Sequence, residues 1–267
     1  MRLIKYLFFA VFAMYSLNCR SQQSTRIVDF DKYFAACNVE GCFVLYDLEN
    51  NQLTVSNPEC CKTGFLPAST FKIFNSLVAL ETGVVAGKSF LIKWDGKDYG
   101  NADWNRDQTL ESAFKVSAVW YYKEIARRIG EDRMQDWLNR AEYGNMNTDG
   151  GIDLFWLRGG LRITPIEQAL FLSQLVKETL PFSKVNQQMV KEIMLEKDQD
   201  GYRFGAKTGW GVLADKTNIG WLVGYILKNG KWYTFATKIE SKTEIKGFQQ
   251  MRRDITAQIL GQLGLDK

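Results

Sequence analysis

Residue patterns typical of β-strands occupy the two ends of this chain, and patterns typical of helices occupy the middle. Short apolar or alternating runs predict strands at 42–46, 52–56, 202–208, 219–227 and 232–239. Asn229-Gly230 separates the last two runs and is typical of a two-residue hairpin turn. Two or three strands at one end make a poor sheet alone, so we expect both ends of the chain to build one antiparallel sheet.

Amphipathic patterns fill most of the region from about residue 88 to residue 180. Segments 109–114, 120–129 and 133–141 fit helices, and Thr164-Pro165-Ile166-Glu167 is a capping box that predicts a helix to about residue 177. Helices are also predicted at 26–37, 69–82 and 248–263. We therefore predict an α/β (α+β) fold, in which a central antiparallel sheet is flanked by terminal helices and an all-helical lobe is inserted.

The first residues have the pattern of a secretory leader. Arg2 and Lys5 precede an apolar run from Leu7 to Leu17, which is shorter than a membrane span. We interpret residues 1–19 as a signal peptide and residues 20–267 as one domain that is exported to the periplasm. A lipoprotein leader that anchors the chain through Cys19 is the less favoured alternative, because asparagine directly before the cysteine fits such a site poorly.

Histidine is absent from the 267 residues. This absence excludes the serine–histidine–aspartate triad, the cysteine–histidine dyad and every catalytic zinc site that uses histidine. A general base in this chain must be a carboxylate, a lysine, or a group made from one of them.

Charge and cysteine content exclude two further classes of protein. The formal net charge is +4, and it is +2 once Arg2 and Lys5 are removed with the leader, so no nucleic-acid partner is expected. Cysteines remain at positions 37, 42, 60 and 61. In an oxidising compartment we expect one disulfide, between Cys42 and either Cys60 or Cys61. No paired C-x-x-C spacing indicates a zinc site, so no metal is expected.

The segment Pro67-Ala68-Ser69-Thr70-Phe71-Lys72 is the strongest candidate for a reactive site. Ser69 falls in the first turn of a predicted helix, and Lys72 follows three residues later on the same face. Backbone amides at a helix start can stabilise an oxyanion. A second Ser-x-x-Lys, at Ser112 and Lys115, lies inside its helix and lacks this setting.

A second short motif also occurs in two copies. Lys-Thr-Gly starts at Lys62, in a loop interpreted as a turn, and again at Lys207, at the end of a predicted strand. Only the copy at Lys207 can offer a strand edge to a cleft.

Four motifs in a fixed order resemble the class D (oxacillinase-type) serine β-lactamases of the penicillin-recognising superfamily. They are Ser69-Thr70-Phe71-Lys72, Ser117-Ala118-Val119, Tyr143-Gly144-Asn145 and Lys207-Thr208-Gly209. The similarity runs from about Cys42 to the last helix and includes the segment from Gly150 to Leu157. It implies a β-lactamase/transpeptidase-like fold and an enzyme that hydrolyses the β-lactam amide of penicillin-type antibiotics and so confers resistance.

The resemblance also implies how a site without histidine obtains its base. Lys72 reacts with carbon dioxide to become a carbamate (N6-carboxylysine), held by the indole N–H of Trp156, and no other cofactor is needed. Phe71, Val119 and Leu157 belong to an apolar pocket that disfavours the ammonium form of this lysine. The modified Lys72 takes the proton of Ser69, whose oxygen attacks the lactam carbonyl, and later activates water to release the acyl-enzyme.

The remaining roles follow the same resemblance. The backbone amides of Ser69 and Trp210 are expected to form the oxyanion hole, and Ser117 to pass a proton to the leaving nitrogen with help from Lys207. The substrate carboxylate is expected to bind Lys207, Thr208, Gly209 and Arg252. Arg253 is the alternative to Arg252, because one slip in helical register exchanges them. The Tyr143 motif is expected to shape the cleft wall.

Two other functions share this motif set. One is a penicillin-sensing receptor domain, which keeps the drug as a stable adduct and follows several membrane spans, whereas this chain has one short leader. The other is a D-alanyl transpeptidase or carboxypeptidase, which carries asparagine where Val119 stands. The expected partners are small β-lactam substrates, and the expected assembly is a monomer or a dimer.

Overall fold

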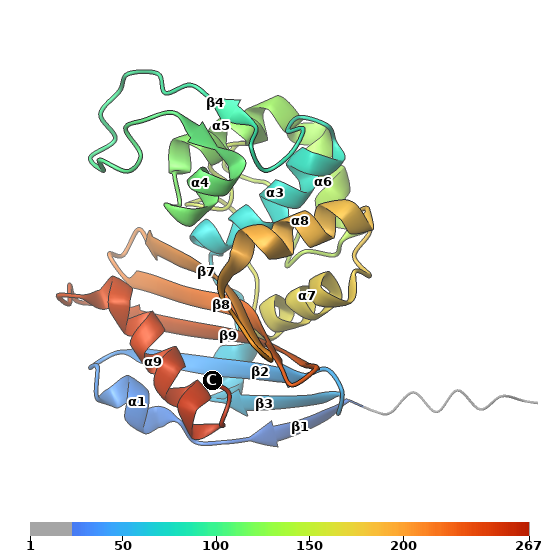
Figure 1. Ribbon diagram of the computed structural model, residues 1–267. Helices are drawn as coiled ribbons and strands as arrows, with labels where there is room; N and C mark the ends of the chain where they lie inside the picture. The colour runs from blue at the N-terminus through green and yellow to red at the C-terminus, as the bar shows by residue number, and fades with distance from the viewer. Residues whose placement is uncertain (1–22, 267) are drawn as a thin grey trace, which may run out of the picture.

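The two ends of the chain build one sheet, as predicted. A computed structural model describes residues 23–266 (Figure 1), so the proposed leader lies outside the described residues. The sheet has the strand order β1-β3-β2-β9-β8-β7-β6. Its strands are β1 (Ser24–Ile27), β2 (Glu40–Asp47), β3 (Gln52–Ser56), β6 (Leu195–Gln199), β7 (Tyr202–Val212), β8 (Asn218–Lys228) and β9 (Lys231–Ser241). The turn at Asn229-Gly230 joins β8 to β9 as expected.

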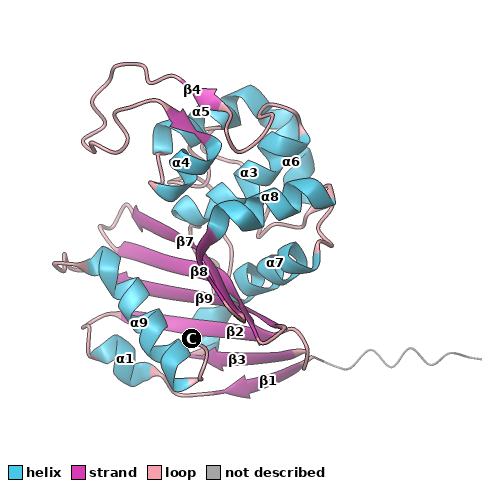
Figure 2. Cartoon of the chain, in the orientation of Figure 1, coloured by secondary structure: helices cyan, strands magenta, loops and turns pink. Residues whose placement is uncertain are grey.

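Helices cover both faces of this sheet (Figure 2). Helices α1 (Asp31–Ala35) and α9 (Phe248–Gln262) lie on one face, and α7 (Pro165–Lys177) packs on the other. Thr164 and Glu167 cap α7 reciprocally, which confirms the capping box read from the sequence. Short helices α2 (Pro58–Lys62) and η1 (Ala68–Phe71, a 3-10 turn) connect the sheet to the inserted lobe.

The inserted lobe is mainly helical and sits above one end of the sheet in Figure 1. It consists of α3 (Lys72–Glu81), α4 (Leu110–Lys115), α5 (Val119–Ile129), α6 (Glu131–Arg140), α8 (Lys184–Met194) and a small antiparallel pair, β4 (Leu91–Ile92) and β5 (Gln108–Thr109). The prediction of an all-helical lobe was therefore wrong at this pair. Two-residue strands are too short to leave an alternating pattern in the sequence.

Two further expectations about the sheet and its helices were wrong. The helix expected at 26–37 is confined to Asp31–Ala35, because residues 24–27 instead form β1, the one parallel strand of the sheet, against β3. Hydrogen bonds to an open sheet edge outweigh the weak helical pattern there. Helix α8 and strand β6 were not predicted from the sequence. Lys62, which was expected in a turn, instead forms the last residue of α2.

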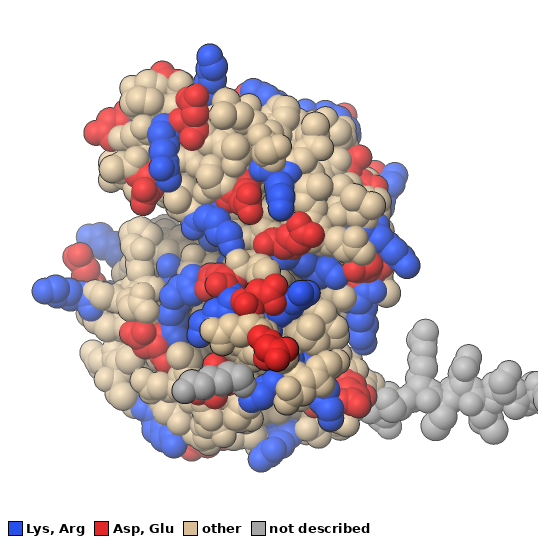
Figure 3. All heavy atoms as spheres, viewed as in Figure 1, with Lys and Arg blue, Asp and Glu red and all other residues tan. Residues whose placement is uncertain are grey.

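The core is divided by the sheet. One cluster of buried side chains joins the helical lobe to the face of the sheet that meets it, and a second fills the space under α1 and α9. A disulfide joins Cys42 to Cys60, which is one of the two pairings expected from the sequence. Cys61, the other candidate, is a buried free thiol. No helix within residues 23–266 is both long and apolar enough to cross a membrane. Cationic and anionic side chains are interspersed over the face shown in Figure 3.

Candidate active site

Ser69 and Lys72 meet at the junction of η1 and α3. The Lys72 ammonium nitrogen donates a 2.7 Å hydrogen bond to Ser69 Oγ. Both side chains are buried, with Ser69 9% and Lys72 0% exposed. The residue before the nucleophile, Ala68, has a left-handed backbone with φ of 49°, and its amide donates a 3.0 Å bond to the carbonyl of Trp156. The surrounding fold therefore fixes the turn that carries the serine.

Burial makes Lys72 an unusual lysine. It lowers the pKa of Lys72 from 10.5 to about 7, because an ammonium loses its hydration in this apolar pocket. The ring of Tyr122 lies 5.3 Å from the Lys72 nitrogen, and the Tyr122 hydroxyl shares a 2.9 Å hydrogen bond with Ser76. At neutral pH a large share of Lys72 is thus the neutral amine, which can act as a base or a nucleophile.

Trp156 completes the buried wall behind this pair. Its ring stacks on Phe71 with centroids 5.1 Å apart, and the side chain is fully buried. The indole Nε1–H has no hydrogen-bond partner among the described residues. Because a buried unpaired donor costs about 1–3 kcal/mol, this N–H marks a place where an acceptor would bind favourably. Leu157 is partly buried against the same core.

Strand β7 brings the Lys207 motif to the nucleophile. Strand β6 pairs with β7 only as far as Gly205, so from Ala206 onward one edge of β7 has no strand partner. A side chain at Gly209 would lie 3.0 Å from the Pro67 carbonyl, which shows how closely this strand approaches η1. The approach needs glycine and leaves a backbone edge beside Ser69.

Lys207 and Arg252 form a cationic region next to that edge. Lys207 is 3% exposed, and its nitrogen donates to the carbonyl of Thr208 at 3.0 Å. Burial, followed by the nearby cations, lowers the pKa of Lys207 well below its usual value. Arg252 is also buried, donates to the Gly209 carbonyl, and leaves its Nε without a partner. Arg253 instead pairs with Glu196, so Arg252 is the arginine that faces β7.

The second-serine motif lies in a tight turn between α4 and α5. Ser117 is partly buried and has a left-handed backbone, with φ of 59°. The Lys207 nitrogen lies 5.4 Å from the ring centroid of Phe114, which lies in the last turn of α4. Val119, partly buried, begins α5. The turn and the Lys207 motif thus lie close together.

Some residues near the site were not found from the sequence. Tyr122 and Ser76 support Lys72, but only the i, i+4 spacing of Ser76 could have indicated this. Tyr143 is buried and packs on Phe71 and Phe74, with ring centroids 5.8 and 4.7 Å away, and its expected role in the cleft wall stays a prediction. Asn145 holds the segment before α7 through Arg162 N at 2.8 Å.

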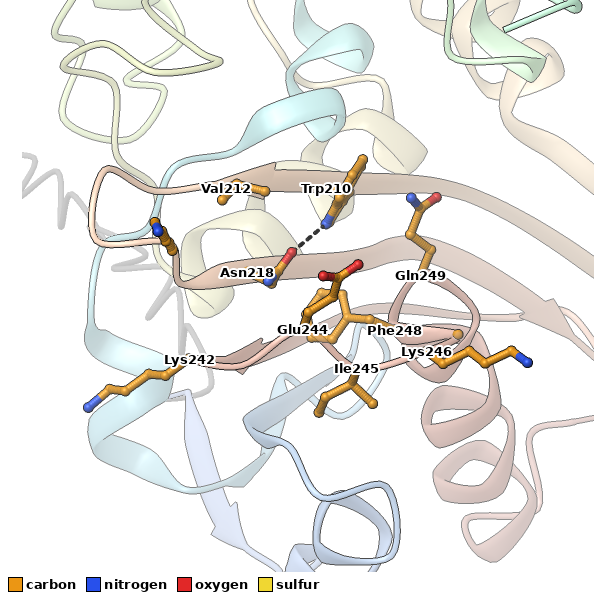
Figure 4. A pocket seen from close by; sticks show the side chains of 11 residues that line it. Trp210, Val212, Asn218, Lys242, Glu244, Ile245, Lys246, Phe248 and Gln249 are labelled. Carbon is orange, nitrogen blue, oxygen red and sulfur yellow. Dashed lines mark hydrogen bonds between the residues drawn. The ribbon is translucent and has the colours of Figure 1, made fainter. Parts of the chain in front are cut away.

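A pocket of about 650 Å³ adjoins the far end of β7 (Figure 4). Trp210 is 45% exposed, and its indole N–H donates at 3.2 Å to Asn218 on the neighbouring strand β8. Figure 4 shows Glu244 directed toward this pair, whereas Lys242 and Lys246 are directed away. Neither Ser69 nor Lys72 lines this pocket. Residues 23–266 contain no group of three or more cysteines, aspartates and glutamates that could hold a metal ion.

The fold and this site define a penicillin-recognising serine enzyme, and comparison with known proteins confirms the class. Residues 41–263 match the family described as penicillin binding protein transpeptidase domain. The chain is 37% identical to β-lactamase OXA-5 of Pseudomonas aeruginosa over 96% of both chains. A class D β-lactamase structure from Nostoc superposes with a TM-score of 0.85 at 39% identity, over 89% of this chain and 99% of that one.

A receptor domain is also similar in structure. The C-terminal domain of the Bacillus licheniformis BlaR penicillin-receptor superposes with a TM-score of 0.86 at 30% identity, over 91% of this chain and 98% of that domain. The closer sequence matches are to enzymes. This chain belongs to the class D serine β-lactamases, which hydrolyse β-lactams.

Proposed function

We propose that this protein hydrolyses penicillin-type antibiotics through an acyl-enzyme on Ser69, with carbamylated Lys72 as the general base. The observation that carries the proposal is the buried 2.7 Å contact between Lys72 Nζ and Ser69 Oγ in a class D chain. The neutral Lys72 amine adds carbon dioxide and releases one proton to form the carbamate. The unpaired Trp156 N–H supports this modification, since it would donate to a carbamate oxygen.

The residues then act in a fixed sequence. Lys72 in its carbamylated form removes the proton of Ser69 as the serine oxygen bonds to the lactam carbonyl carbon. The amides of Ser69 and Trp210 stabilise the oxyanion, and Ser117 gives a proton to the leaving nitrogen with help from Lys207. Lys72 finally deprotonates a water molecule, which attacks the acyl carbon and frees Ser69.

The substrate is oriented by its carboxylate. Lys207, Thr208, Gly209 and Arg252 form the proposed binding edge, and the open Nε of the buried Arg252 supports that role. Phe71, Val119 and Leu157 make the surroundings of Lys72 apolar, which disfavours the ammonium that a protonated carbamate would leave on losing carbon dioxide.

A variant at the base tests the mechanism. Lys72→Ala should hydrolyse a chromogenic cephalosporin at least about 1,000-fold more slowly than wild type, because the reaction loses its general base. Near-normal turnover by this variant would exclude Lys72 as the base. The wild-type enzyme in degassed buffer of mildly acidic pH should lose activity and regain it on addition of bicarbonate. Activity that ignores bicarbonate would mean that Lys72 acts as a plain amine.

A penicillin-sensing receptor domain is the second candidate, favoured by the likeness to the BlaR domain. A D-alanyl transpeptidase or carboxypeptidase would share the same slow release of penicillin. The lifetime of a fluorescent penicillin adduct separates both from the enzyme. We expect the adduct to turn over within seconds, and an adduct that persists for hours would support a receptor or a transpeptidase.

We also propose that residues 1–19 direct export to the periplasm, on the basis of their sequence pattern. Cell fractionation and N-terminal sequencing of the purified protein test this. A mature chain that begins at a palmitate-labelled Cys19 would show a lipid anchor instead.

A further inference from the structure

The first two residues of β6 are held by side chains from two different helices. The Lys115 ammonium, at the end of α4, donates to the carbonyl of Leu195. Arg253, in α9, donates two hydrogen bonds of 2.9 Å to the carboxylate of Glu196. Lys115 lies two residues before Ser117, and Arg253 follows Arg252. The dipeptide 195–196 therefore links the helix that precedes the second serine to the helix that carries the cleft arginine.

Electrostatics also link the Glu196 carboxylate to the cations of the cleft. Burial, and after it the positive charges on Arg252 and Arg253, disfavours the ammonium form of Lys207, whereas Glu196 favours it. Lys72 adds a further positive charge while it is unmodified, and as the proposed carbamate it adds a negative charge instead. Burial lowers the pKa of Lys115, whereas Glu196 and, on the same helix, Glu111 favour its ammonium form. The Glu196 carboxylate thus partly offsets the two arginines of α9 near Lys207, where an anionic substrate is expected to bind.

We propose that Glu196 is a positioning residue for β-lactam turnover. It fixes the helix of Arg252 through the ion pair with Arg253, and its charge offsets the cations around Lys207. The inference rests on the proposed carboxylate-binding role of Lys207 and Arg252. Glu196 has no part in bond making.

The ion pair is better suited to this role than to stabilising the fold. The Glu196 and Arg253 side chains are 29% and 37% exposed, and such partly exposed pairs contribute little to the stability of a fold. Their geometry is nevertheless fixed, because the two-point contact orients the guanidinium plane. Both side chains line a cavity of about 250 Å³ between α9 and the sheet, so solvent in this cavity can reach the ion pair.

Two substitutions that break the same ion pair give opposite expectations. Glu196→Gln removes the negative charge, so the pKa of Lys207 falls and the alkaline limb of kcat/KM for benzylpenicillin moves to lower pH. Arg253→Gln removes a positive charge, so the pKa of Lys207 rises and the limb moves to higher pH. In Glu196→Gln, the apparent acid dissociation constant of the alkaline limb should rise roughly two- to fivefold above the wild-type constant, with the change mainly in KM. A purely structural role would make the two variants change alike.

Matched variants serve as controls. Asp198 lies on the same strand as Glu196 and makes a 2.9 Å contact with Arg203 of β7. Asp198→Asn breaks this contact and should leave the pH profile unchanged. Glu196→Asp keeps the charge and should retain the wild-type alkaline limb, and circular dichroism checks that each variant is folded. The inference would be overturned if the alkaline limbs of Glu196→Gln and Arg253→Gln coincide with each other, or if both move in the same direction from the wild-type limb. Absence of turnover in the wild-type enzyme would instead overturn the proposed function.

Discussion

Lys72 shows the conflict between chemistry and stability at a single residue. A fully buried lysine with one hydroxyl partner is an unfavourable group in a protein core, and the lowered pKa measures that cost. The same lowered pKa provides the neutral amine that carbamylation requires. The residue is destabilising for the reason that makes it reactive.

Replacing this lysine by an apolar residue should therefore stabilise the fold. Below pH 7 both the folded and the unfolded chain hold the proton, so the penalty of the buried ammonium is fully present, and it declines as the pH rises from about 7 to 10.5. Lys72→Met should raise the free energy of unfolding by about 2–5 kcal/mol at pH 6 and by less at pH 9. Urea denaturation in degassed buffer, which keeps the lysine unmodified, measures the difference. A less stable variant at pH 6 would contradict the argument.

Trp156 allows the carbamate to be tested separately from packing. Trp156→Phe keeps an aromatic ring against Phe71 and removes only the unpaired N–H and part of the ring. We expect a change in stability below about 1.5 kcal/mol. The bicarbonate concentration that gives half-maximal activity should rise roughly tenfold, for the loss of one hydrogen bond to a charged group.

A second buried tryptophan provides the matched control. Trp221 donates its N–H to the Leu66 carbonyl at 2.9 Å, so Trp221→Phe leaves a buried carbonyl unpaired. This variant should lose about 1–3 kcal/mol of stability without a change in bicarbonate dependence. Equal bicarbonate dependence in Trp156→Phe and wild type would remove Trp156 from the carbamate site.

At the scale of elements, local signals predicted the structure well where they were strong. The capping box at Thr164 and the turn at Asn229-Gly230 fix the ends of α7 and of two strands within one or two residues. Strand β1 and strand β6 could not be predicted, because each exists through hydrogen bonds to a partner strand and its side chains are mostly exposed and mostly polar. The sequence carries no periodic pattern for such strands.

The same limit applies to the site. Spacing along one helix predicts the Ser69–Lys72 contact, and the structure places these side chains in contact. Tyr122 contacts Lys72 only because α5 packs on α3, and no motif marks it. The choice between Arg252 and Arg253 depends on how α9 is rotated over the sheet, which adjacent residues of equal charge cannot reveal.

The orientation of helix α9 therefore predicts different effects for substitutions of its two arginines. Arg252→Ala should raise KM for benzylpenicillin roughly 10- to 100-fold with a smaller effect on kcat, since it removes the buried charge that we propose binds the substrate carboxylate. Arg253→Ala should raise KM at neutral pH less than about fivefold, because this side chain pairs with Glu196 outside the cleft. Steady-state kinetics on purified variants give both values. Similar KM increases in the two variants would place Arg253 in the cleft as well.

At the scale of the whole molecule, the site depends on how the lobe and the sheet are joined. Ser69 belongs to the segment that leaves the sheet after β3 and enters the lobe, and this segment begins at α2. The disulfide from Cys42 in β2 to Cys60 in α2 closes a loop with a sequence separation of 18 residues. It fixes the start of the connection, while the approach of Gly209 to η1 fixes its end.

Loss of this disulfide should lower stability and leave the chemistry intact. Closing a loop of this length removes conformational entropy from the unfolded chain, so Cys42→Ser combined with Cys60→Ser should cost about 3 kcal/mol and lower Tm by roughly 6–12 °C. The kcat at 25 °C should stay within about twofold of wild type, because Ser69 and Lys72 are also held by η1, α3 and β7. Calorimetry and steady-state kinetics on one preparation measure both effects, and Cys37→Ser, which removes a free thiol, is the control. A large loss of kcat in a folded double variant would mean that the disulfide positions the nucleophile directly.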